Sequence, residues 1–172
     1  MPMQFRPMIL ALGFAVAGSA LFQAAAQPDV QPLAAPRWAV LAKAGTAVDY
    51  PANIFSVDAG PSTRGRGRRL RTADGRADLM LFVLPNRDRD SPRRFLRQHL
   101  ALPRAKVTYE RITGRFFVVS GIESGRVFYS RCNYPRGSSG PMQCVYLLYP
   151  RAETRAWDGI VTRISRSLRP AA

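Results

Sequence analysis

The chain has 172 residues, and its 26 basic and 11 acidic side chains give it a formal net charge of +15. This length suits one domain with its own hydrophobic core and disfavours two domains. Because the chain contains a single histidine, metal sites built from several histidines are excluded.

The first segment has the features of a cleavable secretion signal. Residues 8–22 form an apolar run, which Arg6 precedes and three alanines at residues 24–26 follow. Signal peptidase recognises small residues after such a run, and the run is shorter than the roughly 20 residues of a transmembrane helix. We therefore expect residues 1–26 to be a signal peptide, and the mature protein to be periplasmic or secreted without a transmembrane span.

The mature region begins with a linker and continues as one domain. Residues 27–36 contain three prolines among small and polar residues, which is typical of an extended linker. Residues 37–170 are predicted to form a single domain. Its first strands are expected at residues 38–41 and 46–50. The second strand should end there, because the proline that follows it has no N–H to donate to a central ladder.

Glycine and arginine dominate residues 61–69, which predicts a mobile basic loop. A hairpin is expected next, because Asp74-Gly75 separates two strand-like segments and glycine accepts the positive φ of a tight turn. Residues 77–84 are apolar at nearly every position. That pattern indicates a strand covered on both faces.

A helix is predicted to start at Ser91-Pro92. Serine can cap the first turn, and proline suits the first helical position because an N–H there has no partner within the helix. His99 falls on the apolar side of this helix, so a partly buried structural role explains it better than a catalytic one. From residue 107 to residue 149, short turns between strand patterns predict an antiparallel meander.

The clearest helix covers residues 157–168. Its apolar residues recur at helical spacing, and arginines fall on the opposite side. The apolar stripe consists of Trp157, Ile160, Val161, Ile164 and Leu168. Together these elements predict an α+β fold with a central, mainly antiparallel sheet, at least two helices, and the C-terminal amphipathic helix packed on the sheet.

The two cysteines are predicted to form a disulfide, because an exported chain folds in an oxidising compartment. If their strands pair as a hairpin, the register that places Cys132 opposite Cys144 also places Ser130 opposite Tyr146. The alternative, a reactive or metal-binding pair, lacks C-x-x-C spacing and a second histidine.

Motifs for catalysis or cofactor binding are weak in this chain. No serine stands in a G-x-S-x-G elbow. Asn86, Asp88 and Asp90 resemble the start of a calcium loop, but Ser91 stands where glycine is required and Arg97 where the bidentate acid should be. We therefore expect no catalytic residue, no cofactor, no metal and no enzymatic activity.

Arginines gather in two stretches of the chain. The guanidinium group binds phosphates and carboxylates through paired hydrogen bonds. The candidate anion-binding residues are Arg64, Arg66, Arg68, Arg69, Arg71, Arg93, Arg94 and Arg97. The sequence leaves open whether the two stretches meet on one surface or simply face solvent, and a GC-rich genome is an alternative explanation for so much arginine.

An exported basic protein meets membrane head groups, acidic polysaccharides and acidic proteins, so an anionic envelope component or an acidic protein is the expected partner. Nucleic acid is disfavoured for the same reason. The expected function is that of a non-enzymatic binding or accessory protein of the cell envelope, and a hydrolase of envelope polysaccharide is the alternative.

The mature region also resembles a known family. The segments that carry the likeness are residues 45–51, 74–75, 114–121, 128–131 and 157–168. On these segments the chain resembles a family of small exported alphaproteobacterial proteins of unknown function. More distantly, the strand that ends in Tyr50-Pro51 and the closing helix are similar to PsbP-like domains, which implies an antiparallel sheet flanked by helices and a role in binding or assembling other proteins. Neither resemblance supplies a catalytic motif.

Overall fold

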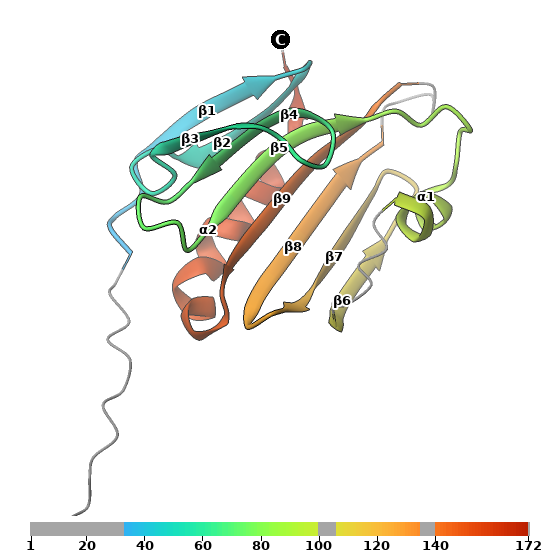
Figure 1. Cartoon of the computed structure of the whole chain (residues 1–172). Helices are drawn as coiled ribbons and strands as arrows, with labels where there is room; N and C mark the ends of the chain where they lie inside the picture. Colours follow the sequence, from blue (N-terminus) through green and yellow to red (C-terminus); the bar gives the residue numbers. More distant parts are fainter. Residues whose placement is uncertain (1–32, 100–105, 135–139, 172) are drawn as a thin grey trace, which may run out of the picture.

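A computed structural model describes residues 33–99, 106–134 and 140–171 (Figure 1). The predicted signal peptide and the first residues of the predicted linker lie outside this part of the chain. Leu33, within the predicted linker, already packs against the core. Asn53 holds the next residues, since its Nδ2 donates to the Ala35 carbonyl at 2.9 Å.

Seven strands form the larger sheet. They are β3 (Val57–Pro61), β4 (Arg66–Arg71), β5 (Asp78–Leu84), β6 (Lys106–Ile112), β7 (Phe116–Glu123), β8 (Arg126–Asn133) and β9 (Met142–Pro150). Their order in space is β3-β4-β5-β9-β8-β7-β6, and every neighbouring pair is antiparallel (Figure 1). The predicted meander is confirmed as the run from β6 to β9.

A smaller sheet joins both ends of the described chain. It consists of β1 (Trp38–Lys43), β2 (Thr46–Pro51) and β10 (Arg169–Pro170), in the order β1-β2-β10. The Asp49 amide donates to Ser167 Oγ at 2.8 Å, and Arg169 Nη1 lies 2.9 Å from Asp49 Oδ1. The two strands predicted at the start of the domain are confirmed as β1 and β2.

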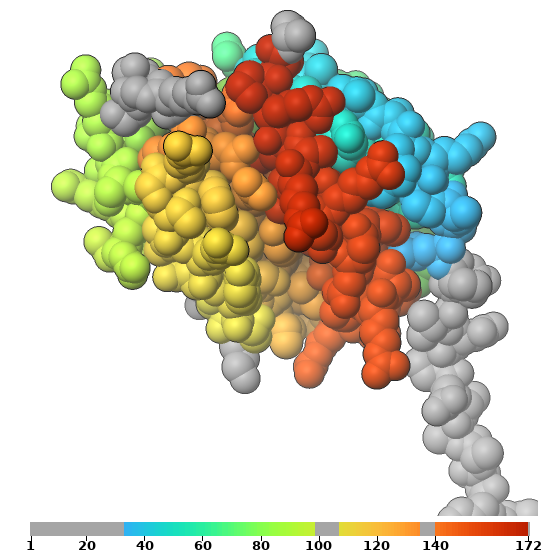
Figure 2. Space-filling view, turned by 180° about the vertical axis from the view of Figure 1, so that it is seen from behind, coloured from blue at the N-terminus to red at the C-terminus, as the bar shows by residue number. Residues whose placement is uncertain are grey.

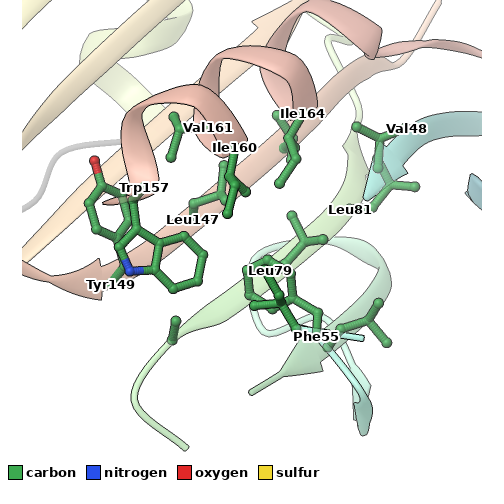
Figure 3. Packing of buried hydrophobic residues seen from close by; sticks show 14 of the residues in the cluster. Val48, Phe55, Leu79, Leu81, Leu147, Tyr149, Trp157, Ile160, Val161 and Ile164 are labelled. Atoms are coloured by element: carbon green, nitrogen blue, oxygen red, sulfur yellow. The ribbon is translucent and has the colours of Figure 1, made fainter. Parts of the chain in front are cut away.

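The helix α2 (Thr154–Ser167) follows a short 3₁₀ turn, Arg151–Glu153, and lies across one face of the sheet (Figure 2). All five residues of the predicted stripe are buried there. Figure 3 shows Trp157 beside Tyr149, whose ring centroid lies 5.4 Å away, and Ile160 and Ile164 above the sheet. Burying each such side chain contributes about 1.5–3 kcal/mol, so this stripe fixes the helix on the sheet.

The helix α1 (Pro92–His99) packs on the opposite face, at the β7 side. Ser91 caps it as predicted, since its Oγ accepts the Arg94 amide at 3.4 Å. Phe95 contacts Phe117, with ring centroids 6.4 Å apart. Neither helix in the described part of the chain is long and apolar enough to cross a membrane.

The predicted disulfide is confirmed beside α1. Cys132 and Cys144 are directly opposed on β8 and β9, with Cα atoms 4.1 Å apart, and both are fully buried. The predicted register also holds, because Ser130 lies opposite Tyr146. The bond therefore joins two central strands of the larger sheet.

The structure corrects the loop predicted at residues 61–69. The strand β3 extends to Pro61 and β4 begins at Arg66, so only four residues connect them. The glycines that suggested mobility instead permit close packing: a Cβ at Gly67 would stand 1.9 Å from the carbonyl oxygen of Leu81 on β5. The arginines of β4, which are Arg66, Arg68, Arg69 and Arg71, therefore occupy fixed positions on a strand.

Candidate anion-binding site

The arginines of β4 divide between the two faces of the sheet, because side chains alternate along a strand. Arg66 and Arg68 share a face with Leu70, which packs in the core beneath α2. Arg69 and Arg71 point to the other face, which carries α1 at its far side. Only the second pair is placed to contribute to a site on that face.

A hollow of about 540 Å³ lies on this second face, over β4, β5, β9 and the β7–β8 turn. The residues of its lining with a formal charge are Arg64, Arg69, Arg71, Arg126, Asp78 and Glu123. Four guanidinium groups and two carboxylates give this lining a net charge of +2. We call this hollow the basic pocket.

Asp78 anchors two of the guanidinium groups in the basic pocket. Its side chain is only 4% exposed, and its Oδ1 accepts the Nε–H of both Arg69 and Arg71 at 2.9 Å. Burial raises the pKa of Asp78, but the hydrogen bonds and the positive charges of Arg69 and Arg71 together more than offset that effect and hold the pKa below its usual value. Asp78 is therefore ionised at neutral pH, and both guanidiniums are held at Nε.

Arg64 reaches the pocket from the connection between β3 and β4. Its guanidinium carbon lies 3.8 Å from the centre of the Tyr146 ring, a cation–π contact that positions it over β9. Burial raises the pKa of Tyr146, and the positive charge of Arg64 opposes that shift only in part. The Tyr146 hydroxyl is consequently neutral at physiological pH and leaves the positive charge of the lining unchanged.

Arg126 completes the pocket from the first position of β8, where it lies opposite Glu123. Among the described residues, neither Arg64 nor Arg126 forms an ion pair within 4.0 Å. The terminal nitrogens of Arg69 and Arg71 likewise donate to no acceptor in the described part of the chain. Donors from three segments are thus left to contact a ligand.

The structure brings together three of the eight candidate arginines, Arg64, Arg69 and Arg71. Arg68 instead pairs with Asp58 on the opposite face. The candidates on α1, which are Arg93, Arg94 and Arg97, are exposed and do not line the basic pocket. The two arginine stretches therefore do not share this pocket.

Sequence reasoning missed Arg126. The signal was present in the predicted β8–β9 register, which places Arg126 on the same face as Ser130 and Tyr146. The pairing of β5 with β9, which brings Asp78 opposite Leu148, joins segments about 70 residues apart and has no local signature. Without that pairing, Arg126 could not be assigned to the same pocket as the β4 arginines.

Two further features bear on chemistry. The described residues contain no cluster of three or more His, Cys, Asp or Glu side chains that could hold a metal. In the segment that resembles a calcium loop, the Asn86 amide is occupied, since Oδ1 accepts the Asp90 amide at 2.9 Å and Nδ2 donates to the Asp90 carbonyl at 3.1 Å. The side chain of His99 lies outside the described part of the structure.

A second hollow, of about 630 Å³, lies on the α2 face beside β6 and β7. Tyr109, Tyr129 and Tyr149 line it, and its charged side chains are Arg151 and Asp158. Burial raises the pKa of Tyr149 to about 12, so its hydroxyl is neutral at physiological pH. One positive and one negative charge give this lining no preference for an anion.

Comparisons with known proteins bear on the fold. No protein-family model matches the sequence, and no curated protein matches it. The crystal structure of the Ran-binding protein Mog1p from Saccharomyces cerevisiae is 8% identical, with a TM-score of 0.56 over 79% of this chain and 96% of Mog1p. The solution structure of PsbP (CyanoP) from Synechocystis sp. PCC 6803 is 12% identical, with a TM-score of 0.53 over 81% of this chain and 95% of CyanoP.

At these identities the similarity concerns the fold alone. It confirms the distant likeness to PsbP-like domains that the sequence suggested. The relation to an alphaproteobacterial family stays a prediction. The chain therefore has an α+β fold like those of CyanoP and Mog1p, and its own side chains must supply the argument for function.

Proposed function

We propose that this chain is an exported binding or accessory protein of the cell envelope, and that it holds an anionic partner in the basic pocket. The observation that carries the proposal is the pocket's lining: four guanidinium groups against two carboxylates, in a concave site. One carboxylate, Asp78, already forms ion pairs with two of the arginines. Such a site favours an anion over a neutral or cationic ligand.

Two features support placement outside the cytoplasm. The Cys132–Cys144 disulfide is typical of a protein that folds in an oxidising compartment. The amino-terminal sequence has the pattern of a cleavable signal. The partners available there are anionic lipids, acidic polysaccharides and acidic proteins. Mog1p, which shares the fold, is described as a Ran-binding protein, so a binding role is compatible with this architecture.

The test compares two double variants that remove the same charge. Arg64→Gln with Arg126→Gln removes two pocket guanidiniums that pair with no described carboxylate. The matched control, Arg66→Gln with Arg97→Gln, removes two exposed arginines outside the pocket. Binding is measured by sedimentation with phosphatidylglycerol vesicles and with polygalacturonate, at fixed ionic strength.

We expect the pocket variant to lose about tenfold in affinity for at least one of these anions, which corresponds to about 1.4 kcal/mol. The control should lose less than about threefold, because it changes only the long-range field. Equal losses in the two variants would show that net charge alone drives binding, and would reject the basic pocket as the site.

A further inference from the structure

We infer that the basic pocket binds a phosphate group, carried by a soluble ester or by a lipid head group, and that Asp78 orients two of the guanidiniums that hold it. This inference rests on the proposed function and narrows it to one ligand chemistry. It depends on three properties of the pocket: the direction of its donors, its net charge and the burial of Asp78.

The donors approach from three segments. Arg69 and Arg71 extend from β4, Arg64 from the preceding connection, and Arg126 from the start of β8. A carboxylate offers two oxygens in one plane, so the guanidinium groups from which it accepts hydrogen bonds must all lie near that plane. A phosphate monoester offers three terminal acceptor oxygens in a tetrahedral arrangement, and so can accept from several forks at once.

The charge of the lining agrees with this choice. The net charge of +2 is neutralised by a phosphate monoester, which carries about −1.5 to −2 at neutral pH, and by two neighbouring phosphodiesters. A single carboxylate would leave half of the positive charge uncompensated. Phosphate therefore matches the lining in both charge and number of acceptors.

Asp78 gives the site a fixed geometry. Because it accepts only the Nε–H of Arg69 and Arg71, the terminal nitrogens of both side chains remain available as donors. Because Asp78 is buried on β5, those two forks are held in place before a ligand arrives. Preorganisation of this kind improves affinity by removing side-chain entropy that would otherwise be lost on binding.

The deciding experiment separates orientation from charge. Asp78→Asn and Glu123→Gln each remove one negative charge from the lining, but only Asp78→Asn disturbs the arginine forks. Titration calorimetry of the full exported chain uses inorganic phosphate and, as the carboxylate probe, trigalacturonate. We expect Glu123→Gln to bind phosphate up to about threefold more tightly than the parent, because it removes a carboxylate that repels the anion. Asp78→Asn should bind about tenfold more weakly, because the arginine forks are no longer held in place.

A second variant covers the case in which Asp78→Asn does not fold. Arg71→Lys keeps the charge but removes the fork, and its side chain is 38% exposed, so folding should be preserved. We expect at least about a fivefold loss of phosphate affinity. Thermal unfolding of each variant checks that the fold is intact.

The outcomes are distinct. The phosphate inference is wrong if phosphate and trigalacturonate bind equally, or if Asp78→Asn binds phosphate as tightly as Glu123→Gln. The proposed function is then still decided by the separate test with Arg64→Gln and Arg126→Gln. If neither anion binds and vesicles do not either, both are wrong. Phosphatidylglycerol vesicles distinguish the source: binding that inorganic phosphate competes away indicates a lipid head group, and phosphate binding without vesicle binding indicates a soluble ester.

Discussion

Asp74 and Glu153 show how single carboxylates tie the β4–β5 turn to α2. Asp74 accepts hydrogen bonds from Thr72 Oγ1 at 2.6 Å and from the Arg76 amide at 3.0 Å. Arg76 also pairs with buried Glu153, whose second oxygen accepts Trp157 Nε1–H at 3.1 Å. The turn, the helix start and the largest core side chain are thus linked through one arginine.

Asp74 should make the protein sensitive to acid. Hydrogen bonds from Thr72 and the Arg76 amide lower the pKa of Asp74 from 3.8 to about 2. Between these values the unfolded chain binds the proton and the folded chain does not, so the stabilisation is present above pH 4 and is lost as pH falls toward 2. Since Asp74 is half exposed, the effect is modest.

Urea unfolding of the parent and of Asp74→Asn across this pH range measures the effect. The parent should be the more stable protein at pH 5 and above, and the difference should shrink toward zero near pH 2. Two stability curves that stay parallel through the acid range would show that Asp74 does not contribute in this way.

At the scale of elements, the strand β4 depends on a glycine that lies close to its neighbour. A Cβ at Gly67 would meet the Leu81 carbonyl oxygen at 1.9 Å and the Phe82 Cα at 2.6 Å, both of them backbone atoms that cannot rotate away. Gly67 therefore permits β4 and β5 to approach, and this approach sets the positions of Arg69 and Arg71 in the basic pocket.

Gly67→Ala should destabilise the protein by about 1–3 kcal/mol, the usual cost of overpacking, and should weaken anion binding by displacing β4. Gly114→Ala is the control, because no atom lies within 4 Å of a Cβ at that position and its φ is not in the positive range. The control should change the free energy of unfolding by less than about 0.5 kcal/mol. Guanidinium unfolding measures both, and similar losses would contradict the packing argument.

Elements with a strong local signature were predicted well. The apolar stripe that starts at Trp157 and the turn at Asp74-Gly75 both depend on neighbours in sequence, and Gly75 has the expected positive φ of 72°. The strand β3 and the first half of β4 were missed because they contain aspartate, glycine and proline, which are depleted in strands. Pairing rather than composition keeps them extended, because β4 pairs with β5 and β3 pairs in turn with β4.

For the whole molecule, the Cys132–Cys144 bond joins β8 to β9 within the cluster beneath α1. The two cysteines are 12 residues apart in sequence, so the bond closes a short loop of the unfolded chain. In the chain-entropy description, a loop of this size restricts the unfolded state by about 3 kcal/mol.

Replacing both cysteines by alanine should therefore lower the free energy of unfolding by about 2–4 kcal/mol, measured with guanidinium in the absence of reductant. The matched measurement is the parent with and without a reducing agent, which should show a similar loss. An unchanged unfolding midpoint in the double variant would contradict a stabilising role for the bond.

The basic pocket is a property of the whole molecule, and the sequence predicted it only in part. Arg64, Arg69 and Arg71 were recognisable because they lie together in the chain. Asp78 joins them through the predicted β4–β5 hairpin, in which it lies opposite Arg71. Arg126 joins them only after β9 has paired with β5 on one side and with β8 on the other. Contacts of that range are set by the tertiary fold, and no short sequence pattern encodes them.

The alternation along β4 makes the protein intolerant of insertions and deletions there. Leu70 faces the core beneath α2, while its neighbours Arg69 and Arg71 face the basic pocket. One residue gained or lost within β4 would turn the arginines into the apolar core and the leucine toward solvent. The length of β4 is therefore fixed both by the packing of Leu70 and by the positions of Arg69 and Arg71 in the basic pocket.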